Sequence, residues 1–230
     1  MRTQELPTTV IDKLKLRWYV LLRDILSLWV KPKIQADADG NIGSAGDQPV
    51  CYVMDSYALS SVLILDKYCE EKDLNRPLLS IPGIRQSSSR SYAVLKRLKG
   101  IFFRRPVTRT HSEMLELLVE QGWANPDLDI LLVPVTILVG QRPSKESGLT
   151  RSIFAENWEI AGRFRRFFST LVNGRKTFMQ FSRPISLRDL AAEGLDSAVA
   201  LRKVSRILRV HFKRVRTAAI GPDLDGDLVG

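Results

Sequence analysis

The chain has 230 residues, of which 44% are hydrophobic and 26% are charged. This length and composition exclude a disordered or fibrous chain and suffice for one large domain with a sizeable core. Thirty-five Lys and Arg residues against 25 Asp and Glu residues give a formal net charge of +10. Such an excess favours an anionic partner and leaves open nucleic acid, an acidic lipid surface or an acidic protein.

The cysteine and histidine content argues against stabilisation by disulfides or zinc. Cys51 and Cys69 are the only cysteines, and the chain has two histidines. We expect two reduced core thiols and no metal site. The N-terminus lacks a clean signal-peptide core, and no run of about 18 apolar residues predicts a spanning helix. The expected location is therefore the cytosol or the cytosolic face of a membrane.

Residues 11–31 have the periodicity of an amphipathic helix that Pro32 stops. The polar face is narrow, and the apolar arc carries Trp18, Leu22 and Trp29. A wide apolar arc with tryptophans and flanking cations suits a helix lying in a lipid interface, with these three side chains facing the membrane. The same pattern also suits a helix packed into the protein's own core, and both interpretations remain open.

The middle of the chain alternates strand and helix patterns, which favours an α/β sheet domain. A loop is expected at 35–49, and Tyr92–Leu98 could be a strand or a helical turn. The continuous apolar run at 129–139 predicts a central parallel strand, in which Pro134 implies a bulge or a break in the ladder. The other expected elements are strands at 50–54 and 178–181 and helices at 58–69, 110–121 (ended by Gly122) and 153–172.

The C-terminal part predicts two helices, the first capped by Ser186. The second, at 197–216, has one apolar stripe that includes His211 and is otherwise basic. The Gly/Asp-rich tail from Gly221 has the composition of a linker. The basic surface of the last helix comprises Arg202, Lys203, Arg206, Arg209 and Lys213.

No complete set of catalytic residues is found. His111 and Glu116 form H-x4-E, and His111 falls in a predicted helix. Glycine-rich nucleotide motifs and a G-x-S-x-G elbow are both absent, so no cofactor is expected. Arg104 and Arg105 form a compact cationic pair that could contact a phosphate, although such pairs are more often solvated surface.

Four blocks, in the same order, resemble the large bacterial glycerol-3-phosphate 1-O-acyltransferases that use acyl carrier protein or coenzyme A thioesters. The resemblance covers nearly the whole chain and implies that it is the N-terminal, non-catalytic part of such an enzyme. The catalytic H-x4-D box would lie in a missing C-terminal catalytic domain. The blocks are 49–53, 131–143, 178–187, and 210–214 with 218–222.

A second resemblance is to the catalytic acyltransferase domain of the same family. Residues 52–56 resemble the strand that leads into the H-x4-D box, with Ser56 and Ser61 at its His and Asp places. Residues 99–105 resemble the phosphate-binding block G-x-F-F-I-R-R, whereas the E-G-x-R block is missing. Serine cannot act as a base near neutral pH. The resemblance therefore implies a degenerate, catalytically inactive acyltransferase-like domain.

These observations together predict an α/β fold with a small, mostly parallel sheet covered by helices. We expect an N-terminal amphipathic helix at 1–34, the acyltransferase-like domain at 35–184, a basic helical segment at 185–220 and a linker at 221–230. The amphipathic helix at 11–31 and the basic helix at 197–216 would hold the enzyme on anionic phospholipid, peripherally on the cytoplasmic face of the bacterial inner membrane. The basic face could equally dock acyl carrier protein. Competing hypotheses are a nucleic-acid-binding domain, which no motif supports, and an independent enzyme.

Overall fold

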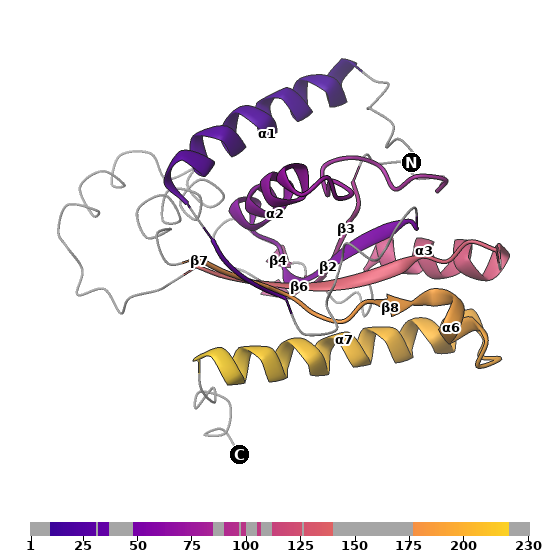
Figure 1. Ribbon diagram of the computed structural model, residues 1–230. Helices are drawn as coiled ribbons and strands as arrows, with labels where there is room; N and C mark the ends of the chain where they lie inside the picture. Colours follow the sequence, from indigo (N-terminus) through magenta and orange to yellow (C-terminus); the bar gives the residue numbers. More distant parts are fainter. Residues whose placement is uncertain are drawn as a thin grey trace.

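The computed structural model describes residues 10–30, 32–36, 48–84, 90–96, 98–99, 105–106, 112–125, 127–139 and 177–220. An open sheet lies between two layers of helices, and a further helix lies outside one of these layers (Figure 1). The helices are α1 (Val10–Trp29), α2 (Leu59–Glu71), α3 (Glu113–Ala124), α6 (Leu187–Ala191) and α7 (Ser197–Ile220).

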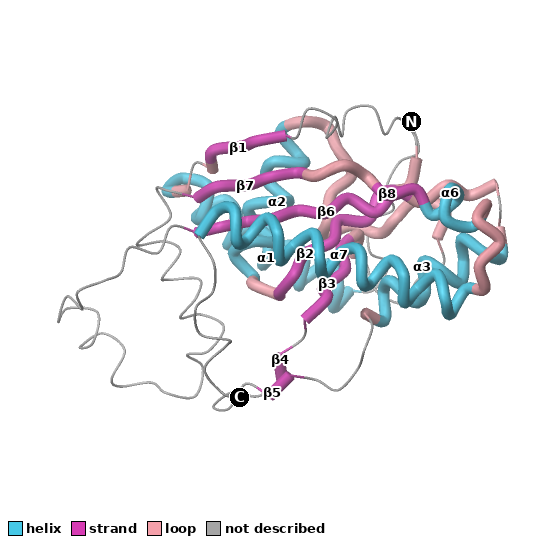
Figure 2. The backbone as a smooth tube through the Cα atoms, turned by 90° about the horizontal axis from the view of Figure 1, so that it is seen from below, coloured by secondary structure: helices cyan, strands magenta, loops and turns pink. Residues whose placement is uncertain are grey.

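The sheet runs in the order β1-β7-β6-β2-β3, and β8 pairs with β6 (Figure 2). Three of the five pairings among the described strands of this sheet are parallel, and the two that β6 makes with β7 and β8 are antiparallel. The predicted α/β class is confirmed, as an open mixed sheet. Its strands are β1 (Lys33–Ala36), β2 (Val50–Ser56), β3 (Tyr92–Lys96), β6 (Leu131–Val139), β7 (Thr177–Phe181) and β8 (Ile185–Ser186). A separate antiparallel pair is formed by β4 (Leu98–Lys99) and β5 (Arg105–Pro106).

Pro134 marks the point where β6 changes partners. Residues up to Pro134 pair with β2, and residues from Val135 onwards pair with β7. The Pro134 carbonyl accepts a hydrogen bond from the backbone N–H of Ser182, at 3.0 Å. Proline has no N–H to donate, so it fits best where one ladder gives way to another. At the interruption expected in this strand, pairing with β2 on one edge of β6 therefore ends and pairing with β7 on its other edge begins.

Alternating side chains of the sheet build two separate cores. On β2, Tyr52 and Met54 point to the face covered by α2, whereas Cys51 and Val53 point to the face covered by α3, α6 and α7. This period of two follows from the pleat of a strand. Both cysteines are free and buried, as predicted, and burial raises the pKa of each thiol to about 12.

The helix α1 does not lie on the sheet but on α2, as a second layer of helix on that side (Figure 1). It contributes Leu22, Leu26 and Val30 to the core that α2 shares with the sheet. Consequently α2 is covered on both sides, and nearly all of its side chains from Ser60 to Asp66 are buried. The predicted helix at 11–31 is confirmed, and its inner face belongs to the core.

Most predicted elements are found, although the short strands β5 and β8 were not predicted and three further differences remain. Residues 33–36 form an edge strand, β1, that was not predicted and that partly overlaps the expected loop at 35–49. Gly122 was wrongly predicted to end a helix, since it lies inside α3, where a Cβ placed on it would lie 3.7 Å from Leu187. The helix begins at Glu113, after Ser112, and both Thr110 and the predicted helix at 153–172 lie outside the described residues.

The Ser186 cap is confirmed. Its hydroxyl accepts a hydrogen bond from the backbone N–H of Asp189, at 3.1 Å, and donates one to the Asp129 carboxylate, at 2.6 Å. The cap therefore fixes the start of α6 against Asp129, two residues before β6.

Candidate functional site

The turn between β2 and α2 is the first candidate site, because it carries both predicted degenerate box residues. Ser56 ends β2, and Ser61 lies in the first turn of α2. Ser56 is half-buried and Ser61 is buried. In open α/β sheets ligands bind outside the carboxyl ends of the strands, which is where this turn stands. The two hydroxyl side chains at this turn provide no base near neutral pH.

Asp55, beside Ser56, forms two ion pairs at this end of the sheet. Its carboxylate lies 2.6 Å from Arg216 of α7 and 3.2 Å from Lys96 of β3. The carboxylate is mostly buried, whereas both cations are about half exposed. Asp55 therefore joins the end of α7 to the end of β2, and these charges serve the packing of the fold.

The other candidate residues of the sequence analysis are only partly described. Arg104 and His111 lie outside the described residues, and of Arg105 the backbone alone is described, paired with Lys99 across β4 and β5. The other histidine, His211, is half-buried in α7 and makes an edge contact with Phe212, at 5.5 Å between ring centroids. Within the described part of the chain, no cluster of three His, Cys, Asp or Glu residues could hold a metal ion.

The outer face of α1 is the second candidate site. Leu14 is 69% exposed, Trp18 is 53% exposed and Leu28 is 82% exposed, and Lys15 and Arg17 flank them. Among the membrane-facing candidates, Trp18 lies on this exposed face, and the side chain of Trp29 is outside the described set. Leu22 is not on this face, because it is buried in the core beside α2. The exposed apolar stripe consists of Ile11, Leu14, Trp18, Leu21, Ile25 and Leu28.

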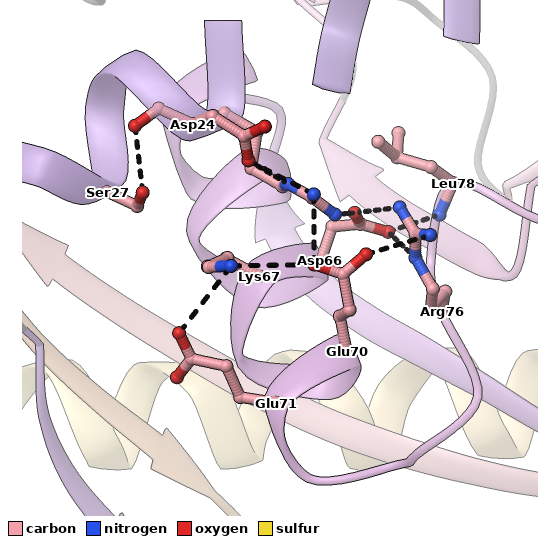
Figure 3. A network of polar contacts seen from close by, with 9 residues as sticks. Asp24, Ser27, Asp66, Lys67, Glu70, Glu71, Arg76 and Leu78 are labelled. Carbon is pink, nitrogen blue, oxygen red and sulfur yellow. Dashed lines mark hydrogen bonds and ion pairs between the residues drawn. The ribbon is translucent and has the colours of Figure 1, made fainter. Parts of the chain in front are cut away.

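A buried ion network attaches α1 to α2 (Figure 3). Arg23 of α1 lies 2.8 Å from Asp66 and 2.9 Å from Glu70, and Arg76 lies 2.7 Å from Asp66. Sequence reasoning missed this network. The signal that could have revealed it is Asp66, a carboxylate at the end of the apolar run of α2.

The network shifts the pKa values of its members. Burial lowers the pKa of Arg23, but the hydrogen bonds that Arg23 donates to Asp66 and Glu70, together with their charges, outweigh burial, so that the pKa is raised overall. Burial also acts to raise the pKa of Glu70, and the hydrogen bond and charge of Arg23 outweigh it, so that this pKa is lowered. Both groups are therefore held in their charged forms at neutral pH.

The outer face of α7 is the third candidate site. Arg202, Arg206, Arg209 and Lys213 are exposed, as expected of the basic surface. Lys203 is half-buried and forms an ion pair with Glu193. The opposite face of the helix packs on α3 and the sheet through Ala200, Val204, Leu208 and Phe212. None of the described helices is both long and apolar enough to cross a membrane.

A family model, the glycerol-3-phosphate acyltransferase PlsB N-terminal domain, matches residues 18–221. The chain belongs to this family. A glycerol-3-phosphate acyltransferase of Xanthomonas axonopodis pv. citri is 43% identical over 210 residues, which are 90% of this chain and 24% of that protein. One of Xylella fastidiosa (strain 9a5c) is 38% identical over 90% of this chain and 25% of that protein. One of Pseudomonas savastanoi pv. phaseolicola is 34% identical over 88% of this chain and 24% of that protein.

The chain spans about a quarter of the length of these relatives. No solved structure matches it. The family inferred from the four sequence blocks is thus confirmed. The expectation that the chain corresponds to only one part of a longer enzyme is confirmed as well.

Proposed function

We propose that this PlsB N-terminal domain is a non-catalytic part of a full-length enzyme that transfers an acyl chain to the sn-1 hydroxyl of glycerol 3-phosphate, the first step of phospholipid synthesis. The donor would be acyl carrier protein or coenzyme A carrying the chain as a thioester, and no cofactor is required. The observation that supports the non-catalytic role is the β2–α2 turn, where Ser56 ends β2 and Ser61 lies in the first turn of α2. In this proposal the two serines stand at the positions that the resemblance assigns to a base and its orienting carboxylate.

Acyl transfer to a hydroxyl requires a group that accepts the hydroxyl proton as the thioester carbonyl is attacked. A histidine oriented by a carboxylate is suited to this role, since its pKa lies near neutrality. A serine hydroxyl is not, because it holds its own proton throughout the neutral range. Asp55 is the carboxylate closest in sequence, and Arg216 and Lys96 hold it in ion pairs.

The test is an acyl-transfer assay with glycerol 3-phosphate and acyl carrier protein or coenzyme A thioesters. The full-length protein should form lysophosphatidate, and the 230-residue chain should form none. Turnover by the 230-residue chain would contradict the non-catalytic role. No turnover by the full-length protein would contradict the proposed activity.

Membrane docking is the second part of the proposal, and α1 is the element that would supply it. Its outer stripe places Trp18 and five aliphatic side chains on the surface, beside Lys15 and Arg17. An apolar stripe with an aromatic residue and flanking cations is suited to the interface of an anionic bilayer. The domain would then lie peripherally on the cytoplasmic face of the bacterial inner membrane.

Vesicle flotation of the full-length protein tests this docking. Leu21→Glu, on the α1 stripe, should lower binding to vesicles of anionic phospholipid by roughly tenfold or more, since a buried leucine contributes about 1.5–3 kcal/mol. Val210→Glu, at a position of similar exposure on α7, is the matched control and should leave binding unchanged. Equal loss in both variants, or none in Leu21→Glu, would contradict docking through α1. A dimer that Leu21→Glu dissociates would instead assign the stripe to a second copy.

Nucleic-acid binding is the competing function, and it rests on the net charge and the basic face of α7 alone. No helix-turn-helix, zinc finger or RNP-type motif accompanies that charge in the sequence. A duplex-DNA shift assay at physiological salt, run beside the flotation assay, separates the two. Binding to duplex without binding to vesicles would replace membrane docking by nucleic-acid binding.

A further inference from the structure

The outer face of α7 combines cations with apolar side chains. Val199, Ile207 and Val210 are 40%, 41% and 44% exposed, among Arg202, Arg206, Lys213 and Arg214. A purely solvated helix face has no need of exposed aliphatic residues at three positions. Arginine among apolar side chains is instead the composition of a protein–protein interface.

The cations on this face are available to a partner. Lys203 is paired with Glu193 and Arg216 with Asp55, but within the described part of the chain Arg202, Arg206, Lys213 and Arg214 form no ion pair. These four positive charges are spread over three turns of one helix. Their mutual repulsion is relieved when an acidic surface lies against them.

The face is also rigid before any partner arrives. The inner side of α7 is anchored in the core by Val204, Leu208 and Phe212, and its last turns are tied to β2 by the Arg216–Asp55 pair of 2.6 Å. A helix that is already ordered loses little conformational entropy on binding, which favours a stable interface.

The position of α7 separates its partner from that of α1. In Figure 1 the order of the layers is α1, α2, the sheet and α7, so that the outer faces of α1 and α7 point in opposite directions. A planar bilayer that contacts the α1 stripe cannot at the same time contact the outer face of α7. The expectation that α1 and α7 together hold the enzyme on one membrane is therefore incompatible with this arrangement.

We propose that the outer face of α7 docks an acidic, partly apolar surface in the part of the full-length acyltransferase that lies outside this domain. This inference rests on the proposed function, in which the domain is one part of a longer enzyme. The curated relatives are about four times as long as the matched segment, so most of the protein is tethered to it. A tethered partner has a high effective concentration, which lets even a modest interface remain closed.

Zero-length carbodiimide cross-linking of the full-length protein tests the docking. The reagent joins a lysine amine to a carboxylate that it contacts, and Lys213 is the exposed amine on the proposed interface. We expect cross-linked peptides that join Lys213 to Asp or Glu residues beyond residue 230. Arg202→Glu combined with Arg206→Glu should lower their yield by roughly tenfold or more, because like charges across an interface repel.

The matched control is Lys72→Glu combined with Arg183→Glu, which makes the same change of charge at two exposed positions outside α7. It should leave the cross-links intact, and both double variants should leave vesicle flotation unchanged. The absence of cross-links from Lys213 to the rest of the protein would overturn the inference. Loss of vesicle flotation in the α7 double variant would also overturn it, because the outer face of α7 would then bind lipid. Loss of the cross-links on addition of duplex DNA would overturn it too, because this face would then bind nucleic acid. None of these three outcomes affects the acyl-transfer assay of the proposed function.

Discussion

Arg23 of α1 and Asp66 of α2 form a buried ion pair, with 2.8 Å between Nη1 and Oδ2. The side chain of Asp66 is fully buried, and that of Arg23 is 5% exposed. A carboxylate removed from water in this way is stable only with charged or hydrogen-bonding partners. Arg76 provides a second cation, so the network includes both the outer helix and the loop after α2.

Removal of Arg23 should destabilise the domain strongly. Arg23→Leu leaves Asp66 buried with one cation instead of two, and breaking a buried pair costs about 3–5 kcal/mol. Urea unfolding of the 230-residue chain measures the free energy. Lys15→Leu is the control, because Lys15 pairs with Asp12 on the surface at 3.4 Å, and exposed pairs contribute only about 0.2–1 kcal/mol. Similar small losses in both variants would show that the network does not hold α1 in place.

The lowered pKa of Glu70 predicts a loss of stability in acid. Because this carboxyl has a lower pKa in the folded state than the ordinary value of 4.5, the folded protein binds fewer protons than the unfolded chain in that range. The contribution of Glu70 is therefore complete above that value and disappears as the pH falls through the lower, folded-state pKa. Unfolding free energies of the native chain and Glu70→Gln should differ at neutral pH and converge in acid. A difference that persists in acid would contradict this assignment.

The sequence predicted those parts of the fold that local patterns determine. The strand at 50–54, the Ser186 cap and the two-faced helix that became α7 each follow from neighbouring residues. Strand β1 was missed because its pairing partner, β7, lies more than a hundred residues away in the sequence. Gly122 was misjudged because helix-ending glycine and close-packing glycine look alike until the facing residue, Leu187, is known.

For the candidate sites too, features set by neighbouring residues were predictable and contacts between distant residues were not. The position of Ser56 and Ser61 at a strand-to-helix turn was predictable from the pattern of β2 and α2. The Asp55–Arg216 pair was not, since its members are 161 positions apart. Nor could periodicity tell that Leu22 faces the core while Leu14 and Trp18 face outwards, because α1 is apolar on both of these sides.

Gly122→Ala should stabilise the domain. The added Cβ would lie 3.7 Å from Leu187, which is an ordinary van der Waals contact, and the backbone there is helical. Alanine is favoured over glycine inside a helix by about 0.5–1 kcal/mol. Gly122→Leu, whose longer side chain would run into Leu187 and Ile130, should destabilise the domain instead. Thermal unfolding compares the two variants, and a lower midpoint in Gly122→Ala than in the native chain would contradict the packing described for α3 and α6.

Installing the two box residues should not create an active site. Ser56→His combined with Ser61→Asp would place an imidazole and a carboxylate on the β2–α2 turn of the 230-residue chain. Residue 61 is buried, so a charged carboxylate there is penalised unless the histidine pairs with it. The neighbouring Asp55 remains held by Arg216 and Lys96, and the E-G-x-R block is absent from the sequence. We therefore expect no acyl transfer to glycerol 3-phosphate above the background of the native chain. Circular dichroism would establish that the variant is folded, and turnover by the folded variant would mean that the other elements of an acyltransferase site are still intact.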